Sequence, residues 1–159
     1  MSFILAIHNI LRWFILVGLV LLLIKIIFDF IKFYSSNRVD KDITILFNQS
    51  KKNIEKLFFY LMIIVNIQFA LGFSLYFFNP SVLNLWNDVP TLMKHRELRV
   101  IGIEHPLLMI IFVGLIHYLN VSIKKLENFN QYKKVLIIYI ITIIILILGI
   151  PWFRPLIRI

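Results

Sequence analysis

Residues Val135–Ile150 read VLIIYIITIIILILGI, and this stretch of almost pure Ile, Leu and Val indicates the solvent in which the chain folds. A helix that crosses a bilayer needs about 20 predominantly apolar residues, and this run approaches that length. Gly149 and Pro151 end the run, and Trp152 follows at the expected membrane interface. The stretch therefore predicts a transmembrane helix over about 135–150.

Three further apolar runs precede it, at about 3–33, 54–78 and 98–121. The first is apolar to Ile24 and continues through Lys25, Asp29 and Lys32, whose spacing favours a helix emerging into water. Asn79-Pro80 ends the second, because proline lacks an amide donor and disfavours helical geometry before it. With 60% hydrophobic residues, the chain predicts an all-α fold: an integral membrane four-helix bundle, up-down-up-down, forming one transmembrane domain over 1–159.

The basic residues predict the orientation, because loops on the cytoplasmic side accumulate Lys and Arg. Of the 17 Lys and Arg, 11 fall on one side of the predicted bundle. That side is therefore cytoplasmic, and both termini and the loop from Asn79 to Arg96 lie outside. The 11 residues are Lys25, Lys32, Arg38, Lys41, Lys51, Lys52, Lys56, Lys124, Lys125, Lys133 and Lys134; the other side holds Arg12, Lys94, Arg96, Arg99, Arg154 and Arg158.

Composition also excludes several classes of function. The basic residues lie in short segments between apolar runs and form no continuous stripe, which argues against nucleic-acid binding. The chain has no cysteine, so it has no disulfide, thiolate metal site, iron–sulfur cluster or covalent c-type haem. A redox role requires a cofactor held without a covalent bond.

Two histidines lie at matched depth on different predicted helices. At about 1.5 Å per residue from the outer end, His8 is roughly 7 Å deep and His105 roughly 10 Å deep. Two such imidazoles in a four-helix bundle can supply both axial ligands of one haem b. His117 lies about 18 Å beyond His105 along the same helix and belongs to no common small site. The alternative is that each histidine only bonds a backbone carbonyl or the headgroup region.

Other polar side chains in the predicted membrane region are candidates because lipid makes them costly. Arg12 shares a helical face with His8 and can neutralise a haem propionate or extend outward to water. Glu104, also in the outer half, is expected to pair with Arg12 or with the polar groups of a cofactor. Asn66 and Gln68 favour interhelical hydrogen bonds, and Gly72 permits close helix approach.

The outer loop combines an apolar segment with a basic patch. Val82, Leu83, Leu85, Trp86 and Val89 lie between two prolines, which is typical of a segment in the membrane interface. His95, Arg96 and Arg99 follow as a basic group suited to a partner or a quinone headgroup.

Four segments carry a family resemblance: His8-Asn-Ile-Leu-Arg-Trp-Phe, Gln68-Phe-Ala-Leu-Gly-Phe-Ser-Leu-Tyr-Phe, Leu98-Arg-Val-Ile-Gly-Ile-Glu-His-Pro-Leu-Leu-Met and Gly149-Ile-Pro-Trp. Over nearly the whole chain they resemble small bacterial four-helix membrane proteins labelled cytochrome b-like. The resemblance implies a b-type haem protein of the bacterial cytoplasmic membrane, with His8 and His105 on the matching motif positions. One departure is Asn66, where relatives tend to carry a histidine.

The leading hypothesis is thus a haem b-binding membrane electron-transfer protein or subunit of a redox complex, with a quinol or partner cytochrome as electron donor. The alternative is a cofactor-free accessory or scaffold subunit of a larger membrane complex. A small ion or metal transporter is a third reading, but the chain lacks an acidic pathway and broken-helix pairs. No hydrolytic constellation is present, which favours an electron carrier over a stand-alone enzyme.

Overall fold

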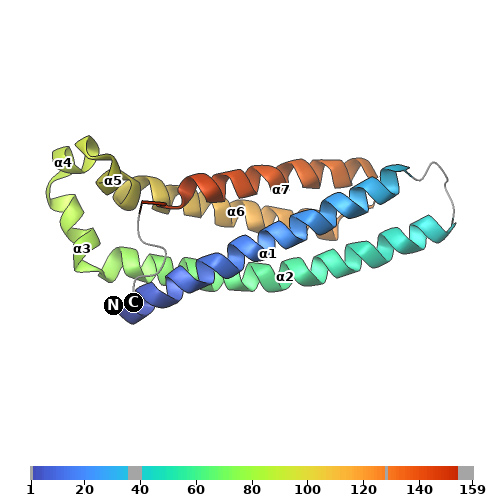
Figure 1. Cartoon of the computed structure of the whole chain (residues 1–159), viewed down its shortest axis with the longest axis horizontal. Helices are drawn as coiled ribbons and strands as arrows, with labels where there is room; N and C mark the ends of the chain where they lie inside the picture. Colours follow the sequence, from blue (N-terminus) through green and yellow to red (C-terminus); the bar gives the residue numbers. More distant parts are fainter. Residues whose placement is uncertain (1, 36–40, 128, 154–159) are drawn as a thin grey trace.

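The computed structural model of the chain describes residues 2–35, 41–127 and 129–153. Its four long helices are α1 (Ser2–Ser35), α2 (Lys41–Phe78), α6 (His105–Lys124) and α7 (Phe129–Gly149). Figure 1 shows them side by side along the long axis, and each contacts its two neighbours in the order α1, α2, α6, α7 and back to α1. The chain is an all-α four-helix bundle, as the sequence predicts.

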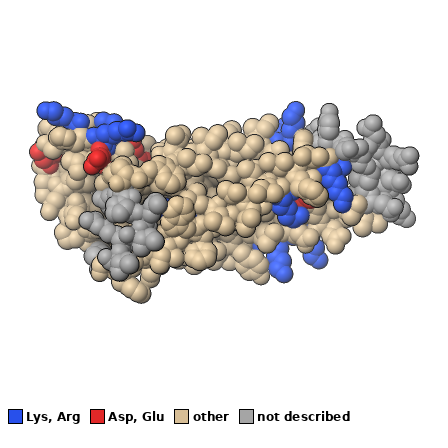
Figure 2. All heavy atoms as spheres, viewed as in Figure 1, with Lys and Arg blue, Asp and Glu red and all other residues tan. Residues whose placement is uncertain are grey.

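Four helical segments are long and apolar enough to cross a membrane: Ser2–Lys32, Ile45–Phe78, Arg96–Lys124 and Gln131–Gly149. On the face seen in Figure 2, charged side chains gather near the two ends, and the middle of the molecule has none. A charge-free belt between two charged ends is the pattern that a bilayer imposes. The chain is a multi-pass membrane protein.

A chain of short helices caps one end of the bundle (Figure 1): α3 (Pro80–Leu83), the 3-10 turn η1 (Asn84–Asn87), α4 (Val89–Lys94) and α5 (Arg96–Arg99). Asn79 ends α2 and starts the cap, since its side chain accepts a hydrogen bond from Ser81 N at 3.0 Å. Asp88 does the same for α4 through Thr91 N at 3.1 Å, and hydrogen bonds from Thr91 lower the pKa of Asp88. The loop predicted to be interfacial is therefore a set of capped short helices.

Leu92 fixes this cap to the bundle. Its side chain is fully buried, and a Cβ on Gly102 would lie 3.0 Å from Leu92 Cδ1. Gly102 belongs to η2 (Val100–Glu104), a turn of π-helix that joins α5 to α6. The absence of a side chain at Gly102 lets the cap pack against the start of α6.

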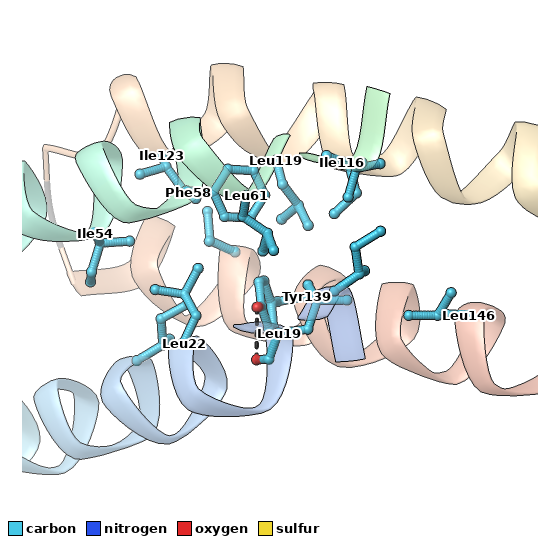
Figure 3. Packing of buried hydrophobic residues seen from close by; sticks show 14 of the residues in the cluster. Leu19, Leu22, Ile54, Phe58, Leu61, Ile116, Leu119, Ile123, Tyr139 and Leu146 are labelled. Atoms are coloured by element: carbon cyan, nitrogen blue, oxygen red, sulfur yellow. Dashed lines mark hydrogen bonds between the residues drawn. The ribbon is translucent and has the colours of Figure 1, made fainter. Parts of the chain in front are cut away.

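The packed core occupies only part of the bundle. Figure 3 shows side chains from all four helices meeting there, with the Tyr139 hydroxyl donating to Leu19 O at 2.9 Å. On α1 the buried apolar residues begin at Ile15, on α6 they begin at Phe112, and on α2 the cluster ends at Val65. Towards the capped end, some residues of this cluster also line the cavity described below: Ile15, Val65, Phe112, Leu146 and Ile150.

At the opposite end, α2 begins well before the predicted start near residue 54. The extra turns combine apolar residues over 43–47 with polar residues after them, and Lys51 and Glu55 form an i, i+4 ion pair at 3.9 Å. The extra turns of α2 also change the surroundings of Asp29, which the sequence predicts to lie where α1 emerges into water. Asp29 is buried, with Lys25 Nζ at 2.9 Å, and it accepts a hydrogen bond from Ser50 Oγ on α2. Of the basic residues used for orientation, Arg38, Arg154 and Arg158 and the side chain of Lys41 lie outside the described parts.

Candidate functional site

The structure brings His8 and His105 together inside the capped end of the bundle. Their ring centroids are 6.4 Å apart, and the rings are nearly perpendicular, at 87°. His8 comes from the second turn of α1, and His105 is the first residue of α6. The depth count from the sequence therefore correctly predicts that the two imidazoles share a level.

A hydrogen bond to α7 fixes the orientation of the His105 ring. Nδ1 lies 2.7 Å from the carbonyl oxygen of Gly149. A carbonyl only accepts, so Nδ1 carries the proton and Nε2 is the unprotonated nitrogen of this ring. Gly149 allows this approach, because a Cβ there would clash with Met109 and lie 3.1 Å from Leu108 Cβ. A protonated Nδ1 bonded to a carbonyl is the usual support of a metal-bound histidine.

Tyr76 supports the backbone just before His105. Pro106 has no N–H to donate to the Gly102 carbonyl four residues earlier. The Tyr76 hydroxyl on α2 donates to that oxygen instead, at 2.9 Å. Sequence reasoning did not select Tyr76; the only signal was the proline four residues after Gly102, which leaves a carbonyl in need of a donor.

Replacing Tyr76 with phenylalanine should lower the stability of the cofactor-free protein by about 1 kcal/mol, because a part-buried carbonyl loses its donor. The measurement is thermal unfolding in detergent, followed by circular dichroism. Tyr60→Phe is the matched control, since Tyr60 lies on the same helix with an exposed side chain. Equal melting temperatures for Tyr76→Phe and Tyr60→Phe would contradict this role.

His8 is held by α2. Its backbone oxygen accepts a hydrogen bond from Gln68 Nε2 at 2.8 Å, so Gln68 forms the interhelical bond that the sequence favours. Its ring lies against Gly72, where an added Cβ would be 3.0 Å from His8 Cε1. Among the protein atoms of the described residues, His8 Nδ1 is buried and has no hydrogen-bond partner. A buried polar atom in that state points to a further group in the site.

Next to the two histidines is a cavity of about 440 Å³. It is bounded by α1, α2, η2, α6 and the end of α7, and Val82 of α3 and Trp86 of η1 line it from the cap. Its walls are mainly apolar, and a few polar side chains face it, among them His8, Arg12, Gln68, Tyr76 and His105. Size and lining are those of a site for a largely apolar ligand with a few polar anchors.

Arg12 and Glu104, the two charged candidates, lie in different places. Arg12 is buried, lines the cavity one turn from His8, and lies 5.6 Å from the centroid of the Trp13 ring. Glu104 is not among the cavity residues: its Oε1 pairs with Arg99 Nε at 2.6 Å. Glu104 therefore does not take the predicted place beside Arg12. The π-helical turn that ends at Glu104 is the reason, because it changes the direction expected from α-helical spacing.

The remaining polar candidates lie apart from the cavity. His117 Nε2 lies 3.0 Å from Asn66 Oδ1, on the exposed surface between α6 and α2. His95 and Arg96 are exposed at the junction of α4 and α5. The sequence correctly separates His117 from the site of His8 and His105.

The donor set limits what the site can hold. Within residues 2–35, 41–127 and 129–153, no three His, Asp or Glu side chains are grouped so that they could bind one metal ion. A metal in the cavity would therefore have His8 and His105 as its protein ligands. Comparisons with protein-family models, with curated proteins and with solved structures find no match to this chain.

Proposed function

We propose that this chain is a haem b-binding electron-transfer protein of the membrane, or such a subunit of a redox complex. The observation that carries the proposal is the pair of imidazoles, 6.4 Å apart beside a cavity of about 440 Å³. A nitrogen bound to a metal at about 2.0–2.1 Å lies roughly 1.1 Å from its own ring centroid, so two ligands in line have centroids about 6.3 Å apart. The separation fits one iron between the rings.

Three features of the chain support this fit. His105 donates Nδ1–H to Gly149, so Nε2 is the unprotonated nitrogen that would bind the iron. His8 presents a buried ring nitrogen with no protein partner in the described structure. Arg12 places a guanidinium at the same cavity, where it can bind a carboxylate of the cofactor.

When bound, haem b supplies a one-electron couple of ferric and ferrous iron. The chain would hold and orient the haem and exclude water from it. The mainly apolar cavity wall keeps the surroundings of low polarity, and Trp86 and Val82 of the cap contribute to it. Since the site lies inside the membrane-spanning part, a lipid-soluble quinol or a partner membrane cytochrome is the electron donor that the proposal favours.

The direct test is a reduced-minus-oxidised absorption spectrum of the protein purified in detergent from haem-replete cells, with haem extraction to identify the type. The expected result is a b-type spectrum and one haem per chain. A colourless protein would overturn the proposal and favour a cofactor-free scaffold subunit, in which the same polar residues only join helices.

We further propose that the chain lies in the bacterial cytoplasmic membrane with its capped end outside. The support is the excess of lysine at the opposite end, as positive residues stay in the cytoplasm. The chain has no cysteine, so single cysteines report location cleanly. Asn87→Cys, exposed in the cap, should react with an impermeant thiol reagent in intact spheroplasts. Asn48→Cys, exposed near the start of α2, should react only after permeabilisation, and the reverse pattern would mean an inverted protein.

A further inference from the structure

A second cavity, of about 190 Å³, lies between α6 and α7 at the lysine-rich end of the bundle. It is separate from the histidine site, and it shares no lining residue with it. Its polar lining comes from both sides: Ser122 of α6 with Lys125, which directly follows α6, and Gln131 and Lys134 from the start of α7.

The lining changes along the bundle axis. Lys125 follows the last residue of α6, and Tyr118 lies seven residues earlier, about 10 Å deeper towards the middle of the bundle. On α7, Val135 and Ile138 follow Lys134 in the same direction. The cavity is therefore cationic and polar where the helices end, and apolar or aromatic further in. A phospholipid has the same order of chemistry, with a phosphate at the interface and acyl chains beyond it.

Charge around the cavity favours an anion. Lys124, Lys125, Lys133 and Lys134 are all exposed at this end of α6 and α7, with Glu127 as the acidic residue in the turn between them. The nearby Lys51 donates to Leu126 O at 2.7 Å, so its ammonium is already engaged. Lys125 and Lys134 line the cavity, whereas Lys124 and Lys133, their neighbours in sequence, do not.

We infer that the cavity between α6 and α7 binds the phosphate headgroup of an anionic phospholipid. Lys125 and Lys134 contribute the opposing charge, Ser122 offers a hydroxyl donor, and Val135 and Ile138 contact the upper part of the acyl chains. The inference holds whether or not the protein carries haem, because the two cavities lie in different parts of the bundle.

The test compares two double variants that remove the same charge from adjacent positions. Purified protein is titrated with mixed micelles containing phosphatidylglycerol or phosphatidylcholine, and bound lipid is counted by native mass spectrometry. Lys125→Gln with Lys134→Gln should weaken phosphatidylglycerol binding about tenfold or more. Lys124→Gln with Lys133→Gln should change it less than about threefold, and Lys125→Arg with Lys134→Arg should retain it.

Two outcomes would overturn the inference. One is an equal loss of phosphatidylglycerol binding in both double glutamine variants, which would indicate attraction by the overall surface charge. The other is equal binding of the two lipids by the unmodified protein. Inorganic phosphate at constant ionic strength distinguishes the sources of the anion. It should compete only weakly, because it lacks the acyl chains; full displacement would assign the cavity to free phosphate. If the double variant Lys125→Gln with Lys134→Gln does not fold, the lipid comparison and the phosphate competition on the unmodified protein still test the inference.

Discussion

His8→Ala and His105→Ala are each expected to yield a folded protein that purifies with less than about a tenth of the haem of the unmodified chain. Under the proposed function, each change would remove one of the two imidazoles that hold the haem from different helices, and the remaining histidine would bind it alone. The measurement is the ratio of extracted haem to protein, together with the reduced spectrum.

His117→Ala is the control for these two variants. His117 lies against Asn66 on the exposed surface and does not line the cavity, so its removal should leave the haem ratio nearly unchanged. Asn66→His tests the same surface, because it restores the residue expected in the resembling family. If His117→Ala lost the haem while His8→Ala and His105→Ala kept it, the cofactor would belong to the pair formed by His117 and Asn66.

Gly72→Leu should have the second largest effect. A Cβ at Gly72 already meets His8 Cε1 at 3.0 Å, so the full leucine side chain must displace the imidazole or fill the cavity beside it. Overpacking of this kind costs about 1–3 kcal/mol, and we expect haem affinity to fall about tenfold or more while the bundle remains helical.

The matched change is Gly114→Leu. Gly114 is exposed on α6, and a Cβ there meets nothing within 4 Å, so the same added volume points into lipid. Both variants are titrated with haem after purification without it, and affinity is read from the absorption change. Equal affinities for the two variants would mean that the ring of His8 does not need the space left by Gly72.

The sequence predicts the four helices and the level of the two histidines because both follow from uniform helical rise. From Phe3 to His8 the helix is regular, and from Leu98 to His105 the chain stays helical through α5 and η2, so a count along each segment places both histidines at a similar depth. Gln68 and Gly72 could be assigned their roles for a similar reason, since polar and small residues inside a transmembrane helix face other helices.

What the sequence did not predict depends on contacts between helices or on departures from α-helical geometry. Glu104 ends a π-helical turn, so α-helical spacing gives it the wrong direction. Tyr76 lies on α2, and its hydroxyl donates to the Gly102 carbonyl of η2, to which Pro106 cannot donate. This contact joins two segments that are distant in the sequence. The spacing of the charges at Lys25, Asp29 and Lys32 predicts that Asp29 lies in water, but α2 starts at Lys41 and brings Ser50 to Asp29.

The bundle has a packed core in one part and a cavity towards the capped end, so the association of its helices does not depend on a bound ligand. The buried contacts that join α1, α2, α6 and α7, such as Phe58 against Tyr139 and Tyr139 against Leu19, lie beyond the cavity of His8 and His105. The helices can therefore associate in lipid before any ligand arrives, since the contacts that hold them together do not include the ligand. A newly inserted chain would therefore have a packed core at one end of the bundle and a cavity that can take up a ligand later at the capped end.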